Sequence, residues 1–271
     1  MDKMGHLRVG IYVDASNITQ NGGYGMQYDV LRSFACRNNG IAVRLNAYVA
    51  YDEELAKLNF EYKRKALNFH SVLRDFGYKV IVKPVKWYID EQGNRYGKSN
   101  ADLDMAVDAL MQSERLDYVL LVTGDGDFVQ VVRALQNRGC RVEVLAFNNV
   151  SQDLKNEADV FTSGYLVPEL SPIEMHDATN GKKIARGVCY SFNHEKGYGF
   201  LRFMKDVTGG LWITDSRKSE SAYQTAFAHS SQFLDLIDFN KLPNREMVFE
   251  FELRDVEGKG LQAEKIILLE K

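Results

Sequence analysis

Apolar runs alternate with segments of helical period from the start of the chain to about residue 167. Five short apolar runs read as strands, at residues 8–14, 41–51, 78–85, 118–124 and 141–147. Four segments between them have the period of amphipathic helices, near Tyr28–Asn38, Glu53–Phe76, Ala101–Arg115 and Asp127–Arg138. Gly139 follows the last of these in the usual C-terminal position. The alternation predicts an α/β fold, a parallel sheet covered by helices.

The pattern changes after Val167. Residues 168–183, "PELSPIEMHDATNGKK", hold two of the four prolines and have no helical or strand period, which is typical of a linker. From Ile184 onward, short β-prone segments separated by turns predict a small all-β barrel. We therefore expect two domains, at 1–167 and 184–271, joined by a linker at 168–183.

Composition limits the function classes. The apolar runs are far shorter than the roughly 20 residues that cross a bilayer, and the polar start is unlike a signal peptide. The expectation is a soluble, cytoplasmic protein without a membrane partner. Cys36, Cys140 and Cys189 lack the spacing of a disulfide framework or zinc site. A net charge of −3 gives no overall attraction to nucleic acid, so binding would need local basic and aromatic patches.

Acidic residues stand at the ends of two predicted strands. Asp14 ends the first strand in "IYVDASN", and Asp125 follows the fourth in "LLVTGD". Ligands of a parallel α/β sheet bind outside the carboxyl ends of its strands, so both side chains are expected at one edge. Asp127 follows at the start of the next helix, where the helix N-terminus favours a negative charge.

The helix that begins near residue 101 carries three further aspartates. Its apolar positions predict one buried stripe, formed by Leu103, Ala106, Val107, Leu110 and Met111. Asp102 and Asp104 would then flank this stripe on opposite edges. Asp102, in the first turn, is the better candidate to reach the strand ends, whereas Asp104 and Asp108 are expected to be solvated surface charges.

Each acid also has a purely structural explanation. Asp102 could belong to a capping box with Ser99, Asp127 could cap a helix, and Asp14 could form an Asx-turn. Two unit charges 4 Å apart repel by about 1 kcal/mol in water and about 4 kcal/mol at an effective dielectric near 20. An unpaired cluster therefore indicates a bound cation. Oxygen ligands without His or Cys suit Mg²⁺ or Mn²⁺, which serve phosphodiester hydrolysis.

These motifs resemble the NYN family of PIN-like ribonucleases. The resemblance covers roughly residues 7–167 and is carried by "VDASN", "KSNADLDMAVD" and "LLVTGDGDFVQVVRALQNRGCRVEVLAF". It implies a metal-dependent endoribonuclease whose catalytic and metal-binding residues are Asp14, Asp102, Asp125 and Asp127, with Asn17 in support. The family usually has Lys-Gly-Val-Asp before this helix, whereas Lys98 lies one residue further away here.

Basic and aromatic residues precede the Asp102 helix in "KPVKWYIDEQGNRYGKSN". The "DEQGN" centre predicts a hairpin beside the acidic site. Arg95 and Lys98 would then be available for phosphates, and the aromatic rings for bases. An ordinary solvated hairpin is the alternative.

The second domain has aromatic residues in alternating positions. "EKGYGFLRF" sets Tyr198 and Phe200 on one face of a strand, and "AFAHS" sets Phe227 and His229 on one face of another. If the strands are neighbours, these rings form a platform for bases, and the glycines of "GYGF" would clear space above it. The alternative is that the rings fill the barrel core.

The same segments are similar to cold-shock domains, a class of OB-fold, over about residues 185–270. The resemblance implies binding of single-stranded RNA or DNA through Tyr198, Phe200, Phe227 and His229, with Lys196 near the backbone. The sequence departs from that family in three places. Ser191 stands where the family has a tryptophan, Ser230 replaces a phenylalanine, and the loop from Met204 to Thr225 is longer and contains Trp212.

Three functions fit these patterns. The leading hypothesis is that the barrel holds single-stranded RNA while the acidic site hydrolyses it with one or two Mg²⁺ or Mn²⁺ ions. The first alternative is a non-catalytic RNA-binding adaptor protein. The second is a phosphotransfer site with an aspartyl nucleophile in "VTGDGDF". The sequence leaves open the cleavage specificity, DNA as a substrate, and the oligomeric state, a homo-oligomer included.

Overall fold

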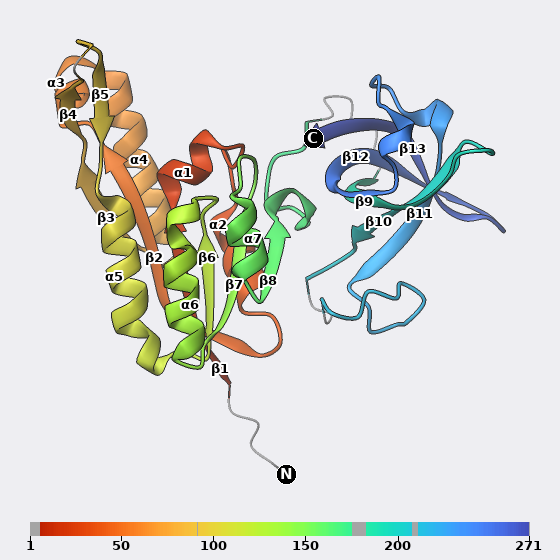
Figure 1. The fold of residues 1–271 in the computed structure, drawn as a ribbon, viewed down its shortest axis with the longest axis horizontal. Helices are drawn as coiled ribbons and strands as arrows, with labels where there is room; N and C mark the ends of the chain where they lie inside the picture. The colour runs from red at the N-terminus through yellow and green to blue at the C-terminus, as the bar shows by residue number, and fades with distance from the viewer. Residues whose placement is uncertain (1–5, 91, 175–182, 208–210, 271) are drawn as a thin grey trace. The chain divides into compact units, whose positions relative to one another are not determined.

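The chain divides into two units, Met1–Ser163 and Gly164–Lys271. The computed structural model describes residues 6–90, 92–174, 183–207 and 211–270 (Figure 1). No helix within those described ranges is long and apolar enough to cross a membrane.

A six-stranded parallel sheet forms the centre of the first unit, in the order β3-β2-β1-β6-β7-β8. Its strands are β1 (Leu7–Asp14), β2 (Gly40–Tyr51), β3 (Lys79–Pro84), β6 (Tyr118–Val122), β7 (Arg141–Ala146) and β8 (Val160–Ser163). Every residue of β6 is buried because helices cover both faces of the sheet. The predicted parallel α/β fold is therefore confirmed, with β8 as a strand that the pattern did not predict.

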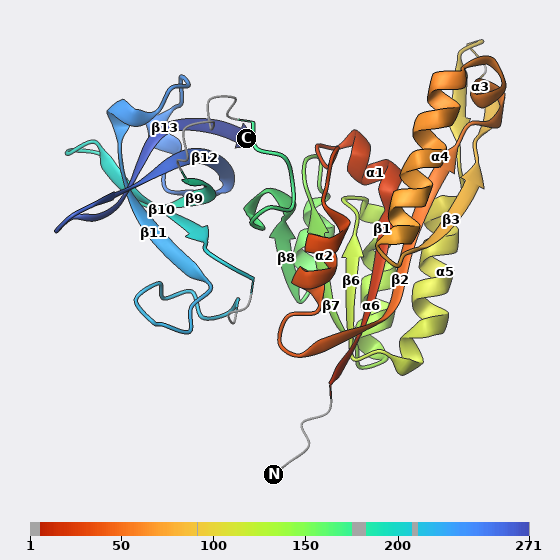
Figure 2. The same cartoon turned by 180° about the vertical axis from the view of Figure 1, so that it is seen from behind.

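Helices cover the sheet on both sides. α5 (Ala101–Gln112) and α6 (Val129–Asn137) lie on one face, and α2 (Tyr28–Ala35) and α4 (Phe60–Asp75) lie on the other, as Figures 1 and 2 show from opposite sides. The single helix predicted over 53–76 is wrong. The segment forms two helices that are separated at Asn59. The extended backbone of Asn59 ends α3 (Glu53–Leu58). The Asn59 side chain accepts a hydrogen bond from the Tyr62 N–H at 2.9 Å and so caps the start of α4. The short helices α1 (Ala15–Gln20) and α7 (Gln152–Glu157) were not predicted.

The buried stripe predicted for α5 is wrong at three of its five positions, while the other two, Ala106 and Leu110, are partly buried and pack against the core. Three of its members are exposed by 62%, 45% and 72%, namely Leu103, Val107 and Met111. The helix instead buries Ala101, Met105 and Ala109 against the sheet. Two of these side chains are single methyl groups, so the helix packs close to the strands. A stripe of larger side chains would hold the helix further away.

Asp104 and Asp108 on α5 were both predicted to be solvated surface charges, and each has a partner within the first unit instead. Asp104 forms an ion pair with Lys83 at 2.7 Å, and its side chain is 38% exposed. Asp108 is partly buried and accepts a hydrogen bond from the Tyr48 hydroxyl at 2.7 Å. Asp108 therefore anchors α5 to β2 rather than standing free in solvent.

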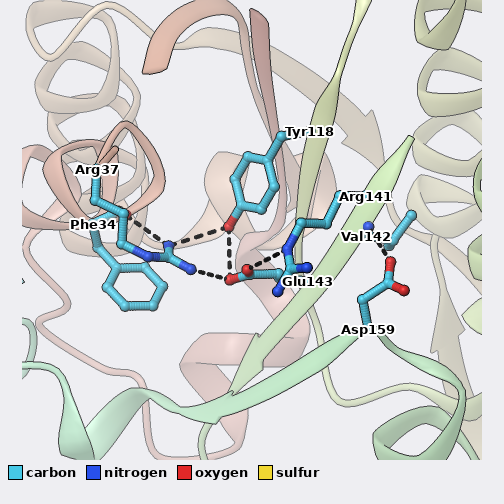
Figure 3. A network of polar contacts seen from close by, with 7 residues as sticks. All are labelled: Phe34, Arg37, Tyr118, Arg141, Val142, Glu143 and Asp159. Carbon is cyan, nitrogen blue, oxygen red and sulfur yellow. Dashed lines mark hydrogen bonds and ion pairs between the residues drawn. The ribbon is translucent and has the colours of Figure 1, made fainter. Parts of the chain in front are cut away.

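A buried polar network joins the end of α2 to the sheet (Figure 3). The Glu143 carboxylate on β7 accepts hydrogen bonds from the Arg37 guanidinium and from the Tyr118 hydroxyl, the latter at 3.0 Å. Arg141 reaches its other oxygen at 3.2 Å. The Arg37 and Glu143 side chains are each only 4% exposed. Neither charge can therefore be solvated by water if its partner is removed.

Removal of the Glu143 charge is expected to destabilise the first unit. The change Glu143→Gln leaves Arg37 buried without a counter-charge, which costs about 3–5 kcal/mol in comparable buried pairs. Denaturant unfolding measures the loss. The control Glu61→Gln removes an exposed pair with Lys65 on α4 and should cost less than about 0.5 kcal/mol. Equal losses in both variants would contradict a stabilising role for the buried network.

The second unit is a closed barrel with the strand order β10-β11-β13-β12-β9. The strands are β9 (Lys183–Asn193), β10 (Tyr198–Met204), β11 (Tyr223–His229), β12 (Asn244–Val256) and β13 (Gly260–Glu270). Leu201, Phe203, Phe249 and Phe251 lie in its core with at most 1% exposure. The all-β character predicted for this part of the chain is confirmed.

Residues before β9 pack onto the barrel. Arg186 on β9 forms an ion pair with Glu250 at 2.7 Å and also donates to the Ser171 side chain and the Pro172 carbonyl oxygen. The Glu174 N–H donates to the Glu250 carboxylate at 3.1 Å. The expected linker at 168–183 thus begins with residues that are fixed to the barrel, and its residues 175–182 lie outside the described part of the chain.

Candidate acidic site and aromatic barrel face

The strand order reverses between β1 and β6. From β1 the chain adds β2 and β3 on one side, and β6, β7 and β8 on the other. Val13 pairs with Val122, so the carboxyl ends of β1 and β6 lie side by side. Such a reversal leaves a crevice in which α/β proteins bind ligands. Asp14 is the last residue of β1, and Asp125 lies three residues beyond β6.

Three of the four predicted acids line one cavity at this edge. The cavity has a volume of about 420 Å³, and we call it the acidic cavity. Asp14 enters it from β1, Asp102 from the first turn of α5, and Asp125 from the loop after β6. Carboxylates from distant parts of the chain therefore meet, as the strand ends and the helix start indicated.

Asp127 lies beside the acidic cavity rather than in it. It is exposed and lines a neighbouring hollow of about 350 Å³, which shares Ser99 and Asp102 with the acidic cavity. Its backbone N–H donates to the Asp125 carboxylate at 2.9 Å. Asp102 therefore stands between the two hollows and connects Asp127 to the other acids.

Burial strongly raises the pKa of the Asp14 carboxyl group. Asp14 is 4% exposed, and burial raises this pKa to about 7. The Asn17 N–H, which donates at 2.9 Å, lowers this pKa, whereas the Asp102 charge, a hydrogen bond to Asp102 and the Asp125 charge raise it. A hydrogen bond between two carboxyl groups needs a proton on one of them. This hydrogen bond can therefore form only while Asp14 or Asp102 is protonated.

The acidic cavity offers oxygen donors only, a set that suits Mg²⁺ or Mn²⁺ rather than zinc or copper. In the part of the chain that the structure describes, no group of three or more His, Cys, Asp or Glu side chains is already arranged to hold a metal ion. The donor chemistry of the acidic cavity fits a hard divalent ion.

Asn17 connects the two strand ends. Its backbone N–H donates to Asp14, and its side-chain oxygen accepts a hydrogen bond from the Gly124 N–H at 3.0 Å. A Cβ atom on Gly124 would lie 3.2 Å from the Asn149 carbonyl oxygen, so the chain is closely packed at this point. The helix α1 thus holds the end of β1 against the loop that carries Asp125.

Asp52 is a further acid at the acidic cavity that the sequence reasoning missed. It directly follows β2, is 9% exposed and lines the cavity. One carboxylate oxygen accepts the Glu54 and Leu55 N–H groups at 3.0 Å each, and the other accepts the Trp87 indole N–H at 3.2 Å. The signal was present in "VAYDEE", where an acid ends the strand next to β1.

The predicted hairpin borders the acidic cavity. Its strands β4 (Lys86–Ile89) and β5 (Arg95–Lys98) pair antiparallel, and Trp87 and Gly97 line the cavity. The Arg95 guanidinium lies 4.4 Å from the centroid of the Trp87 ring and pairs with Glu54 on α3. Arg95 is thus engaged within the unit, and the Lys98 side chain lies outside the described part.

Three aromatic residues form a face on the outside of the barrel. Phe200 on β10 pairs with Phe227 on β11 in the strand register, and Tyr198 lies two residues before Phe200. The ring centroids are 5.3–6.3 Å apart, and all three side chains are partly buried. We call Tyr198, Phe200 and Phe227 the aromatic face. The barrel core is formed by other residues, so these rings are not core filling.

The remaining predicted contacts lie near this face. His229 is exposed and pairs with Tyr198 in the register, and Lys196 is exposed in the turn before β10. The prediction that Gly199 clears space above the aromatic rings is wrong. A Cβ atom there would lie 2.4 Å from the Ser191 carbonyl oxygen, so Gly199 allows β9 to approach β10 rather than clearing space above the rings.

With this geometry established, comparison with known proteins identifies the first unit. An acidic crevice at the switch point of a parallel sheet is compatible with a PIN-like nuclease domain. The model of the NYN domain family matches residues 8–171, more than half of the chain. The chain therefore belongs to the NYN domain family, which is part of the PIN-like nuclease superfamily.

Two further proteins are similar to this chain. The low amplitude and bright protein LabA of Synechococcus elongatus is 26% identical over 159 residues, which cover 56% of this chain and 81% of LabA. A crystal structure of a protein of unknown function from Vibrio parahaemolyticus is 27% identical, with a TM-score of 0.48, and the match covers 60% of this chain and 96% of that one.

The raised pKa of Asp14 predicts a pH-dependent stability. The folded chain keeps this proton up to about pH 7, whereas an unfolded chain releases it near the ordinary pKa of 3.8. The stability that this proton supplies is therefore complete below about pH 4 and is lost as the pH rises to about 7. In EDTA, Asp14→Asn should thus raise the melting temperature relative to the unaltered chain by more at pH 8 than at pH 5.

Asp117 provides the control. Its hydrogen bonds with Arg8 lower its pKa to about 2, so it stays ionised across this range. The change Asp117→Asn should have the same effect on the melting temperature at pH 5 and pH 8. An Asp14→Asn effect that also does not change between these pH values would show that Asp14 has an ordinary pKa.

Proposed function

We propose that the chain is a metal-dependent endoribonuclease, which hydrolyses single-stranded RNA at the acidic cavity and holds the RNA with its barrel. One observation carries the proposal. Asp14, Asp102 and Asp125 line one cavity, where burial, with smaller contributions from Asp102 and Asp125, raises the pKa of Asp14 to about 7. At neutral pH such a cluster is stable only when a proton or a cation offsets the repulsion.

Asp14, Asp102 and Asp125 are the proposed ligands of the Mg²⁺ or Mn²⁺ ion. Asp127 would contribute its negative charge from the neighbouring hollow, which it lines together with Asp102. Asn17 would hold the ends of β1 and β6 together through its hydrogen bond with the Gly124 N–H. When bound, the divalent ion lowers the pKa of water and stabilises charge on the phosphoryl group. In the reaction, a water oxygen bonds to phosphorus, and the bond from phosphorus to the leaving ribose oxygen breaks.

The barrel is proposed to be a cold-shock-like OB-fold that binds the strand. Bases stack on the aromatic face and on His229, and Lys196 meets the phosphates. Arg95 and Lys98 are proposed to contact the RNA beside the acidic cavity, where Arg95 would exchange Glu54 for a phosphate. Because nuclease domain and barrel belong to one chain, binding by the barrel raises the RNA concentration at the acidic cavity even when barrel affinity is modest.

Cleavage of labelled single-stranded RNA tests the acidic cavity. The unaltered chain with Mn²⁺ should give products, and EDTA should abolish them. The change Asp125→Asn removes a ligand charge and should lower the rate by at least about a hundredfold, the scale of a lost electrostatic contribution to catalysis. Asp104→Asn is the control, because Asp104 also carries a carboxylate in the first unit but pairs with Lys83 and does not line the acidic cavity.

The adaptor alternative makes the opposite prediction. It draws support from the absence, within the described residues, of a group already arranged for a metal ion. A non-catalytic adaptor would bind the RNA and give equal, background amounts of product with Mn²⁺, with EDTA and with Asp125→Asn. That result would exclude the nuclease and leave the barrel function intact.

RNA binding in EDTA tests the aromatic face separately. Loss of one stacked base costs about 1–3 kcal/mol, so Phe227→Ala should weaken binding of single-stranded RNA by roughly 5- to 150-fold. Fluorescence anisotropy with a labelled oligonucleotide measures the affinity. Leu236→Ala, which removes a fully exposed apolar side chain of the same unit, should leave it unchanged. Equal affinities for both variants would contradict binding at the aromatic face.

A further inference from the structure

A second cavity lies on the barrel where the loop between β10 and β11 meets the strands. It has a volume of about 450 Å³, and we call it the loop pocket. Tyr190, Phe200 and Arg202 line it from the strands, and Thr214 and Arg217 line it from the loop. Its size lies within the roughly 300–1,000 Å³ of ordinary small-molecule sites.

The loop pocket continues the aromatic face. Phe200 belongs to both, and the Tyr190 ring lies 6.4 Å from the Phe200 ring. A bulge positions Tyr190. In the register of β9 with β10, Phe200 pairs with Ser191 and Leu201 pairs with Cys189, so Tyr190 is the extra residue. Bulges redirect side chains in this way, and this one turns an aromatic ring toward the pocket.

Arg202 gives the loop pocket a positive charge, and the one carboxylate among the described residues that line the pocket, Asp215, pairs with Arg217 instead. The Arg202 side chain lies over the Tyr223 ring, 5.3 Å from the centroid, and it is partly buried. Among the ion pairs of the described residues, none involves Arg202. Arg217, by contrast, is held by Asp215 through two hydrogen bonds of 2.8 Å. Because Asp215 is held by Arg217, Arg202 can pair with an anionic group of a planar ligand that packs against the two aromatic rings.

We propose that the loop pocket binds one nucleotide of the RNA strand that lies on the aromatic face. The base would pack against Tyr190 and Phe200, and its phosphate would pair with Arg202. The Thr214 hydroxyl can donate or accept a hydrogen bond at a base edge or ribose. This inference rests on the proposed RNA binding by the barrel, and it adds a nucleotide subsite built by the inserted loop.

The charge of Arg202 provides the first test. In EDTA, Arg202→Gln should weaken binding of a labelled single-stranded RNA about tenfold at low salt, the scale of one charge-assisted contact. The slope of log affinity against log salt should also fall by about 0.7, the value for one phosphate contact on a single strand. Arg245→Gln removes an exposed arginine of the same barrel that does not line the loop pocket, and should change neither quantity.

The ring of Tyr190 provides the second test. Tyr190→Ala should weaken binding at least about fivefold, whereas Tyr190→Phe keeps the ring and should bind like the unaltered chain. A series of shortened oligonucleotides separates binding from folding. Below the length that reaches the loop pocket, Tyr190→Ala should bind as well as the unaltered chain, which a misfolded barrel would not do.

The outcomes separate this inference from the proposed function. If Phe227→Ala weakens binding while Arg202→Gln and Tyr190→Ala bind normally at every length, the loop pocket does not hold RNA and the barrel function stands. If the unaltered chain binds no single-stranded RNA, both the barrel function and the pocket are overturned. Losses in Arg202→Gln and Tyr190→Ala that appear only with longer strands support the pocket.

Discussion

The burial of Asp14, together with repulsion from the nearby carboxylates of Asp102 and Asp125, is the constraint on which the acidic site depends. Two unit charges 4 Å apart repel by about 4 kcal/mol at an effective dielectric near 20, a large part of the stability of one domain. The buried strands and the hydrogen bonds of Asn17 prevent the chain from relieving this repulsion by moving apart. Only a proton or a cation can neutralise the cluster.

The packing of α5 shows how the fold brings Asp102 into this cluster. Ala101, 2% exposed, lines the acidic cavity next to Asp102, so the first turn of the helix lies close to the strand ends. Ala101 and Ala109, which face the sheet, allow this approach, whereas Leu103, Val107 and Met111 are exposed. Leu103 and Met111 thus remain exposed in the orientation of α5 that brings the Asp102 carboxylate to the acidic cavity.

Much of the fold and part of the site could be predicted from the sequence. Asp14 and Asp125 end apolar runs, and the topology rule for parallel sheets places such residues at one edge without further information. The orientation of α5 could not be predicted, because which side of a helix is buried depends on how closely it packs, and three of the five positions predicted to be buried are exposed. Asp52 was missed although it follows a strand in the same way.

The distribution of positive charge limits the form that the proposed RNA binding can take. With a net charge of −3, no general field attracts a polyanion. Arg95 and Arg217 are both engaged by acidic neighbours, so either would have to exchange a carboxylate for a phosphate with little net gain. Stacking on rings has no such cost, because Tyr198, Phe200 and Phe227 already lie at the barrel surface. The proposed RNA binding by this barrel should therefore depend more on aromatic contacts than on salt, and it should favour unpaired bases over duplexes.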